Sequence, residues 1–272
     1  MVSILIVVGV LVFAWALRTF RHPIPRKLGL VGFLVGTYLA FYFSTGSHLA
    51  GVGGVALWFL LPWVELLTRV RSIRLPREAP FDSQPPPGSA RFPQLADLTD
   101  EIEELGFEHV ADRGREWDGM EHFVRLFYHS DSRTEASIGF QEQEGIAWGY
   151  LSLTSRATSG TWYRTTDLPF TSTLRGARHI IARRVTDCPS FYHLNEAHEV
   201  SLSSFAIENE DLIESEEADL IEALDMEASS QIDRNIEDGI LKAAENEELI
   251  RFSLRGLIYL YTRVLRDVVR LS

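Results

Sequence analysis

Two histidines in the second half of the chain come closest to a metal-ligand pattern. His193 and His198 stand five positions apart within the sequence His-Leu-Asn-Glu-Ala-His. Zinc-binding helices place two histidines four positions apart, which keeps both on one face. Five positions correspond to about 140° of rotation, so these two side chains diverge on a helix. We therefore expect no metal site here. His198 shares an apolar stripe with Leu194 and Leu202, which favours a hydrogen-bonded histidine of the core.

Acidic side chains could serve general acid–base catalysis, but the sequence has too many of them to single out a pair. Several surround Trp117 in a glycine-containing stretch, which is typical of a surface loop rather than a catalytic centre. These residues are Asp112, Glu116, Asp118 and Glu121. The chain has no phosphate-binding glycine loop, dinucleotide fingerprint, nucleophile elbow or kinase signature. The sequence therefore predicts no catalytic residue and no cofactor.

A single cysteine and one hydroxyl-rich stretch complete the candidates. Cys188 follows two arginines, but no glycine-rich cradle accompanies it, which favours an inert thiol. As the one cysteine of the chain, it also excludes an intramolecular disulfide and a cysteine-based zinc site. Residues 155–167 contain many hydroxyl groups together with Arg156 and Arg164. We regard them as a weak candidate for a ligand or protein contact, with ordinary turn chemistry favoured.

The N-terminal third has three apolar runs that are almost free of charge, at residues 2–17, 28–45 and 49–67. A membrane-spanning helix needs about 20 mostly apolar residues, with about 17 as the lower limit. The runs therefore predict three transmembrane helices within an anchor over residues 1–75. Buried helices of a soluble domain are the disfavoured alternative. A cleaved signal peptide is disfavoured for the first run because no basic residue precedes it.

Basic residues flank these runs unevenly. They lie between the first and second runs and after the third, whereas the loop between the second and third has none. The basic residues are Arg18, Arg21, Arg26, Lys27, Arg69, Arg71, Arg74 and Arg77. Because positive loops stay in the cytoplasm, we expect a multi-pass protein with its N-terminus outside and its C-terminal domain cytoplasmic. The same cations could bind anionic headgroups, so the lipid bilayer is the first expected partner.

Small residues recur at intervals of four in the second and third runs. Gly32, Gly36 and Ala40 form one series, and Ala50 and Gly54 form another. Small side chains allow helices to approach closely inside a membrane. The favoured interpretation is that the second and third helices pack on each other as a hairpin. The alternative is a docking face for another subunit.

The soluble part is predicted as an α+β fold, in which an antiparallel sheet packs on helices. Six prolines in residues 76–93 indicate a stiff linker, and residues 94–206 form the α+β domain. Two helices are expected over residues 92–105 and 190–205. An antiparallel meander of four or five strands is expected over residues 107–111, 122–129, 134–140, 146–155 and 161–165.

Residues 207–272 are expected to form an acidic helix, a short hairpin and a basic amphipathic helix. The acidic helix is interpreted as a solvated face, with a docking surface for a basic partner as the alternative. On the last helix one arc carries Arg251, Arg255, Arg263, Arg266 and Arg270. This arc is expected to pair internally with the acidic segment, and binding at the membrane interface or to a partner is the alternative.

The net charge and the lack of catalytic motifs in the sequence together favour a non-enzymatic function. The chain has 26 basic and 38 acidic residues, a net charge of −12, which argues against a nucleic-acid partner. We expect a membrane-anchored accessory or scaffold protein, a subunit of a larger assembly, with protein partners at its transmembrane helices or acidic surface. The alternatives are a membrane-tethered enzyme and a ligand sensor, each with its site in the α+β domain.

Overall fold

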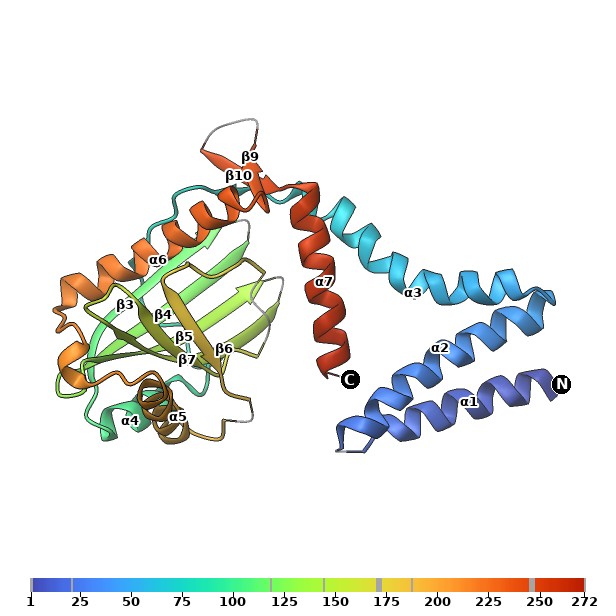
Figure 1. Ribbon diagram of the computed structural model, residues 1–272, viewed down its shortest axis with the longest axis horizontal. Coiled ribbons are helices and arrows are strands. Elements are labelled where there is room, and N and C mark those ends of the chain that lie inside the picture. Colours follow the sequence, from blue (N-terminus) through green and yellow to red (C-terminus); the bar gives the residue numbers. More distant parts are fainter. Residues whose placement is uncertain are drawn as a thin grey trace. The chain divides into compact units, whose positions relative to one another are not determined.

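The computed structural model describes residues 2–20, 22–117, 119–143, 145–169, 173–186, 188–244 and 248–271. Arg21 and Asp118 lie outside the described residues, and so does the side chain of Arg270. The chain divides into two compact units (Figure 1). The first unit comprises Met1–Ile73 and Phe252–Ser272, and the second unit comprises Arg74–Arg251.

The first unit is helical. Its elements are α1 (Val2–Arg18), α2 (Pro23–Thr45), α3 (His48–Thr68), the 3₁₀ turn η1 (Val70–Ser72) and α7 (Leu254–Leu271). Two of these helical segments are long and apolar enough to cross a membrane: Ile24–Thr45, with 22 residues, and His48–Ser72, with 25. Helix α1 is apolar but has only 17 residues, which is about 26 Å against a hydrocarbon core of about 30 Å. The structure thus supports two candidate spans and not clearly the three that were expected.

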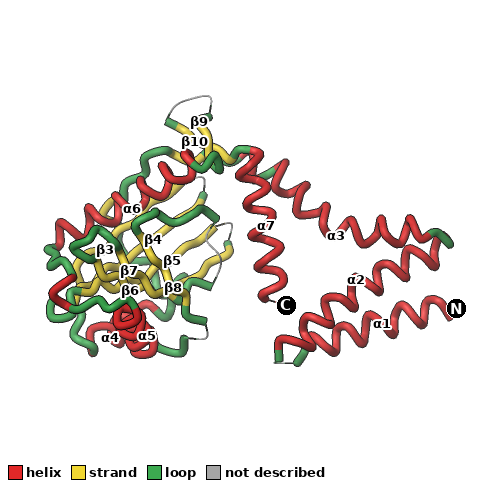
Figure 2. The backbone as a smooth tube through the Cα atoms, viewed as in Figure 1, coloured by secondary structure: helices red, strands yellow, loops and turns green. Residues whose placement is uncertain are grey.

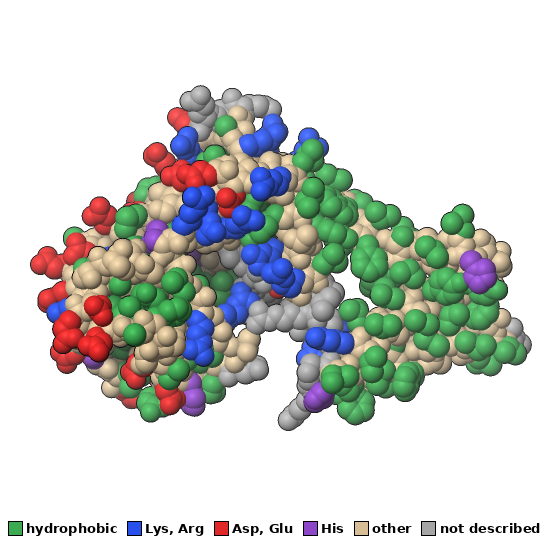
Figure 3. Space-filling view, in the orientation of Figure 1, with side chains coloured by type: hydrophobic (Ala, Val, Ile, Leu, Met, Phe, Trp, Pro, Cys, Tyr) green, Lys and Arg blue, Asp and Glu red, His purple; other side chains and the backbone are tan. Residues whose placement is uncertain are grey.

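Apolar side chains cover the outside of these helices, as Figure 3 shows in green. The exposed fraction is 66% for Trp15, 82% for Leu49 and 64% for Leu61. Water-soluble folds rarely expose contiguous apolar surface on this scale. The outer surface of the helices is therefore suited to an apolar surrounding.

Glycines of α2 set its contact with α1. A Cβ atom added at Gly32 would lie 2.7 Å from the Cβ of Ala14, and one added at Gly36 would lie 2.6 Å from Cδ2 of Leu11. Side chains at these positions would push the two helices apart. The expected small-residue contact therefore exists for Gly32 and Gly36, but its partner is α1 rather than α3.

The small residues of α3 face α2. A Cβ atom added at Gly54 would lie 2.5 Å from the ring of Phe41, and one added at Gly51 would lie 2.7 Å from the ring of Tyr38. Ala40 is exposed and Ala50 is partly exposed. The α2–α3 hairpin thus forms through glycine on one helix and aromatic rings on the other. Small residues spaced by four indicate the helix face that makes a close contact, but they do not identify which helix packs against it.

The second unit contains a seven-stranded sheet with the order β2-β3-β4-β5-β6-β7-β8 (Figure 2). Its strands are β2 (Asp82–Ser83), β3 (Glu108–Trp117), β4 (Met120–His129), β5 (Thr134–Gln143), β6 (Ile146–Arg156), β7 (Trp162–Thr166) and β8 (Ile180–Arg184). Neighbouring strands from β2 to β7 are antiparallel, as the meander predicted, whereas β8 pairs with β7 in parallel. The sheet is therefore mixed. No strand was predicted at β8 because its five residues include two arginines.

The acidic stretch around Trp117 forms strands, so the expected surface loop is wrong. Trp117 pairs with Met120, which makes a hairpin of β3 and β4. Gly119, with a φ of 70°, supplies the left-handed turn residue that such a tight connection needs. The sequence predicted a strand over residues 107–111 but not the rest of β3, because charged residues and Gly114 interrupt its apolar alternation.

Two helices cover one face of this sheet: α4 (Leu95–Glu104) and α5 (Phe191–Ser204). Together they enclose the main core, which contains Ile102, Phe123, Phe127, Phe140, Phe191 and Leu194. The expected helices over residues 92–105 and 190–205 are thus present. Helix α5 begins after Ser190, whose hydroxyl accepts a hydrogen bond from the backbone N–H of His193 and caps the helix.

Helix α6 (Glu217–Glu237) runs across the opposite face of the sheet, as Figure 1 shows. The turn η2 (Asn209–Asp211) precedes it. A smaller core joins this helix to the sheet through Val124, Leu126, Leu224, Ala228 and Phe81. The acidic residues of α6 thus accompany an apolar stripe, which explains why a strongly negative segment is helical and folded.

The proline-rich segment contributes to the second unit as well. Strand β1 (Leu75–Pro76) pairs with β10 (Leu249–Phe252), and β10 lies beside β9 (Leu241–Ala243) in a small three-stranded sheet. Strand β2 and the buried rings of Phe81 and Phe92, 4% and 5% exposed, belong to residues 76–93. Much of the segment predicted as a linker is therefore packed against the sheets.

Candidate functional site

Buried polar side chains mark the sheet face that α6 covers. On β6, Leu151 and Leu153 point into the main core, so Tyr150, Ser152 and Thr154 point to the opposite face. Polar groups that leave water need hydrogen-bond partners inside the protein. The partners of these three residues define the candidate site.

An ion pair joins α6 to the sheet at this face. Arg164 on β7 donates from Nη2 to Oε2 of Glu227 on α6 at 2.7 Å, and from Nε to Oγ1 of Thr154 at 3.0 Å. The arginine and glutamate side chains are 20% and 23% exposed. A bidentate arginine–carboxylate pair is stronger than a single hydrogen bond and fixes the relative orientation of the two side chains. The pair therefore holds one helix at one place on the sheet.

Glu135 on β5 lies close to this ion pair. Burial raises the pKa of its carboxyl group to about 7, although Arg164 and Arg156 act in the opposite direction. Glu135 thus exchanges a proton near neutral pH, as a general acid or base must. It also adds a second carboxyl group beside Glu227, so Arg164 balances the charge of both.

His122 and Tyr150 form a neutral pair on the same face. Their Nε2 and hydroxyl oxygen are 3.0 Å apart, and His122 is only 7% exposed. Burial lowers the pKa of His122 to about 3 and raises the pKa of Tyr150 to about 12. Neither group titrates near neutral pH, so the pair can donate and accept hydrogen bonds but is poorly suited to proton transfer.

A glycine makes room for the tyrosine. A Cβ atom added at Gly139 on β5 would lie 2.1 Å from Cζ of Tyr150. The ring therefore lies directly over the backbone of the neighbouring strand. Any side chain at Gly139 would displace Tyr150 and separate it from His122.

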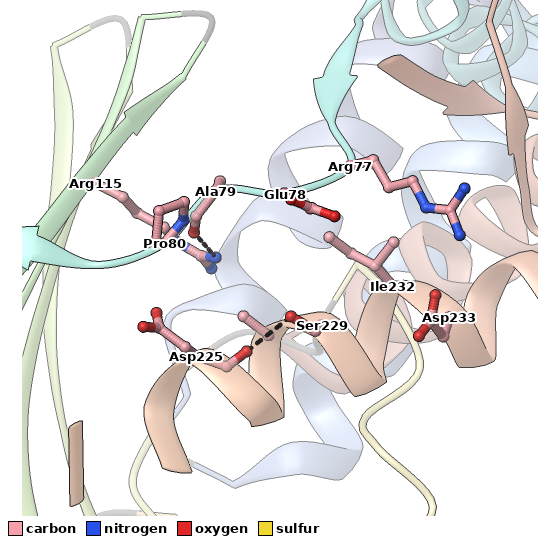
Figure 4. A pocket seen from close by; sticks show the side chains of 10 residues that line it. Arg77, Glu78, Ala79, Pro80, Arg115, Asp225, Ser229, Ile232 and Asp233 are labelled. Atoms are coloured by element: carbon pink, nitrogen blue, oxygen red, sulfur yellow. Dashed lines mark hydrogen bonds between the residues drawn. The ribbon is translucent and has the colours of Figure 1, made fainter. Parts of the chain in front are cut away.

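A cavity of about 300 Å³ opens between the segment 77–80, strand β3 and helix α6. Figure 4 shows Arg115 reaching toward Ala79 while Asp225, Ser229 and Asp233 line the helix side. The cavity wall thus carries charges of both signs. A small molecule there could contact several polar groups at once.

Arg115 is held in this cavity by aromatic rings rather than by a carboxylate. Its guanidinium lies 4.2 Å from the ring centroid of Phe81 and 4.5 Å from that of Trp117. It donates a long bond, 3.5 Å, to the carbonyl oxygen of Ala79, and its Nε is buried without a partner. Burial lowers its pKa to about 10. A planar guanidinium with unused donors suits a carboxylate or phosphate group.

The histidines singled out by sequence are placed as expected. His198 is 1% exposed and lies between Ser155 Oγ at 3.0 Å and Thr165 Oγ1 at 2.9 Å, so it is a hydrogen-bonded core histidine. The His193 ring instead contacts Ser190 Oγ at 2.7 Å. Among the residues that the structure describes, no cluster of three or more metal-ligating side chains occurs.

Cys188 and Arg156 also have structural partners. The Sγ atom of Cys188 contacts the carbonyl oxygen of Ser190 at 3.2 Å, and burial raises the pKa of the thiol, as expected of an unreactive cysteine. Arg156 donates to Ser215 Oγ at 2.6 Å. Neither residue faces the cavity.

Two of the carboxylates around Trp117 pair with arginines. Asp112 accepts two hydrogen bonds of 2.8 Å from Arg125, and Glu121 accepts one of 2.6 Å from Arg91. Such pairs fix β3, β4 and the segment before α4.

The cations predicted at the membrane interface lie at helix ends. Arg18 ends α1, and Arg26 and Lys27 lie in the first turns of α2. Arg69 follows α3 and pairs with Glu65 at 3.2 Å, with Arg71 in the next turn, η1. Arg74 and Arg77 flank β1 in the second unit. Their contact with lipid stays a prediction.

The cations of the C-terminal arc divide between two elements. Arg251 lies on β10, and its Nε is buried without a partner. Arg255, Arg263 and Arg266 lie on α7, where Nε of Arg263 donates to the hydroxyl of Tyr259 at 3.0 Å. The arginines predicted to share one arc therefore do not form one continuous face of α7, because Arg251 lies on β10.

No family model, no curated protein and no solved structure matches the chain. No relative therefore supplies a function for the cavity or for the helices. The proposals below depend on the contacts, burial and charge of this chain alone.

Proposed function

We propose that the protein is a membrane-anchored accessory or scaffold subunit that presents an acidic α+β domain at the cytoplasmic face. The observation that carries this proposal is the outward-facing apolar surface of α2 and α3, two helices long enough to cross a bilayer. The second unit, with its own core, is the domain that they anchor.

The charge distribution supports the orientation. Basic residues lie at the α1–α2 connection and after α3, whereas the connection between α2 and α3 has none. Positive connections are retained in the cytoplasm. With α2 and α3 as spans, this charge bias supports a cytoplasmic position for the second unit.

The contacts inside the second unit favour an accessory role over catalysis. Arg164 pairs with Glu227, and His122 pairs with Tyr150, so the buried polar groups engage one another. Residues 208–248, which include helix α6, contain 16 acidic and two basic residues. A surface with this charge attracts a basic partner electrostatically. A binding role at the membrane follows from these features.

Membrane insertion is tested with full-length protein in isolated membranes. We expect the wild type to resist extraction at alkaline pH and to dissolve only in detergent. Leu60→Arg in α3 is expected to reduce insertion, because an arginine at the centre of a span costs about 3 kcal/mol. Ile146→Arg is the matched control, since Ile146 is also exposed, at 67%, but lies in the second unit.

Topology and assembly are tested on the same membranes. A reporter fused after the last residue should read cytoplasmic, and mild-detergent electrophoresis should show a complex larger than the monomer. A wild-type protein that is soluble without detergent contradicts the anchor, and a second unit cleaved by protease outside intact cells contradicts the cytoplasmic orientation. A monomer in mild detergent contradicts the subunit role.

A ligand sensor is the second candidate, and the position of Arg115 favours it. Keeping a partly buried guanidinium without a carboxylate partner costs stability that a methionine in the same place would not. We expect Arg115→Met to leave the unfolding free energy unchanged or raise it by about 1 kcal/mol. Inorganic phosphate or succinate should raise the melting temperature of the wild type and not that of this variant. A clear loss of stability in the variant contradicts a ligand-binding role for Arg115.

A further inference from the structure

Helix α7 is fixed to α3 by an aromatic contact and a hydrogen bond. The ring of Tyr261 stacks on that of Trp63 with a centroid distance of 4.8 Å, and its hydroxyl donates to the carbonyl oxygen of Phe59 at 3.0 Å. Leu257 and Leu260 are buried beside this contact, at 0% and 6% exposure. Helix α7 is therefore joined to a candidate membrane span by this contact.

The contact lies at a proline turn of α3. Pro62 lies inside the helix and has no N–H group, so the carbonyl oxygen of Trp58, four residues earlier, loses its usual donor. Tyr261 donates to the next carbonyl oxygen of that turn, at Phe59. Donors from neighbouring helices help to accommodate proline inside helices that lie in lipid. The tyrosine thus joins α7 to the turn of α3 that Pro62 weakens.

A second apolar stripe of α7 is left exposed. Leu254 and Ile258, one turn apart, are 63% and 54% exposed, and Leu265 follows on the same stripe. At about 100° per residue, these side chains lie within about 40° of one another. The stripe is distinct from the buried positions Leu257 and Leu260.

Arginines border this exposed stripe. Arg255 and Arg266 lie about 60° to 80° from Ile258 around the helix axis, and Arg263 lies beyond them. Arg255 and Arg266 are exposed, and within the described part of the first unit none of the three forms an ion pair. An apolar stripe beside unpaired cations is the pattern of a helix that lies in a membrane interface.

We propose that α7 is an interfacial helix that binds anionic phospholipids, with Leu254, Ile258 and Leu265 in the acyl region and the arginines on the headgroups. This inference rests on the membrane anchor proposed above and extends it by naming a lipid class. Tyr261 then fixes the depth of α7 relative to the α3 span. The earlier expectation that the arginine arc pairs with the acidic segment is the competing outcome.

The test uses full-length protein in nanodiscs, with Cys188→Ser as background. A spin label is attached to Ile258→Cys, and its collisions with oxygen, which is enriched in lipid, are compared with those of a water-soluble nickel chelate. Leu60→Cys on α3 serves as the lipid reference, and Tyr192→Cys on α5, where the side chain is 58% exposed, serves as the water reference. We expect position 258 to resemble position 60 in discs that contain anionic lipid.

The arginines are tested by the triple variant Arg255→Gln, Arg263→Gln and Arg266→Gln. Each arginine is expected to contribute about a fivefold factor to the binding of α7 to an anionic surface. The label of the triple variant should therefore move toward the water reference in anionic discs, and the wild-type label should do so in purely zwitterionic discs. Arg183→Gln on β8, an exposed arginine of the second unit, is the matched control and should change nothing.

Two outcomes overturn the proposal while the anchor stands. One is a water-exposed label at position 258 beside a lipid-exposed label at position 60. The other is a shielded label at position 258 that responds neither to lipid charge nor to the triple variant, as internal pairing would give. Water exposure at both positions would contradict the membrane anchor itself.

Discussion

Replacing Arg164 with methionine is expected to lower the unfolding free energy of the second unit by about 3 kcal/mol at pH 8. The change leaves Glu227 and the nearby Glu135 without the cation that balances them. Losing one member of a largely buried ion pair costs more than the pair itself contributes, because the remaining charge stays out of water. Urea-dependent hydrogen exchange of the β7 and α6 peptides, in full-length protein, measures the loss.

The pH dependence of this loss follows from Glu135. Burial raises its pKa to about 7, so the folded state binds its proton more tightly than the unfolded chain does. Ionisation of Glu135 therefore costs stability as the pH rises from its unfolded value to about 7. The cost should be larger without Arg164, so the variant is expected to lose more stability at pH 8 than at pH 5.

Two controls separate this effect from the loss of an ordinary ion pair. Arg178 and Glu237 are 3.1 Å apart but 65% and 62% exposed, so Arg178→Met should cost no more than about 1 kcal/mol. The double variant Arg164→Met with Glu227→Leu should recover part of the loss, because it removes the stranded carboxylate. Equal losses for Arg164→Met and Arg178→Met would show that burial of the pair is unimportant.

The elements with clear periodicity were predictable from the sequence. The alternation at residues 134–140 predicted β5, and the apolar stripe around His198 predicted α5 and the histidine's place in the core. These patterns are local, because one buried face repeats every two residues in a strand and every three to four in a helix. Strand β8 and most of β3 lacked them, since arginines and glycines break the repeat.

The candidate site was much less predictable. Arg164 and Glu227 are 63 positions apart, and nothing in either neighbourhood indicates the other. Tyr150, Ser152 and Thr154 do alternate with leucines, which signals a polar second face, but α6 is what buries that face. The cavity at Arg115 likewise needs three separate segments. Tertiary pairing, rather than local propensity, creates both features.

Acidification is expected to destabilise the second unit through His198. Burial lowers the pKa of His198 to about 4, below its ordinary value of 6.5. As the pH falls from 6.5 to 4, the unfolded chain binds a proton that the folded state does not bind, so the stability of the fold decreases over this interval. The loss approaches about 3 kcal/mol by pH 4. Burial of His122, whose pKa is about 3, acts in the same direction.

His198→Gln tests this directly. Glutamine can still form hydrogen bonds with Ser155 and Thr165 but cannot titrate. We therefore expect an unfolding free energy about 1 kcal/mol lower at pH 7, and a smaller decrease of that free energy between pH 6.5 and 4. The measurement is the urea midpoint of hydrogen exchange in α5 and β6 at each pH. His193→Gln, on the same helix but outside the core, should leave the slope unchanged. If His198→Gln instead retained the full acid slope, the stabilising role of a neutral buried His198 would be disproved, and the acid sensitivity would have to come from His122 or from the carboxylates that pair with arginine.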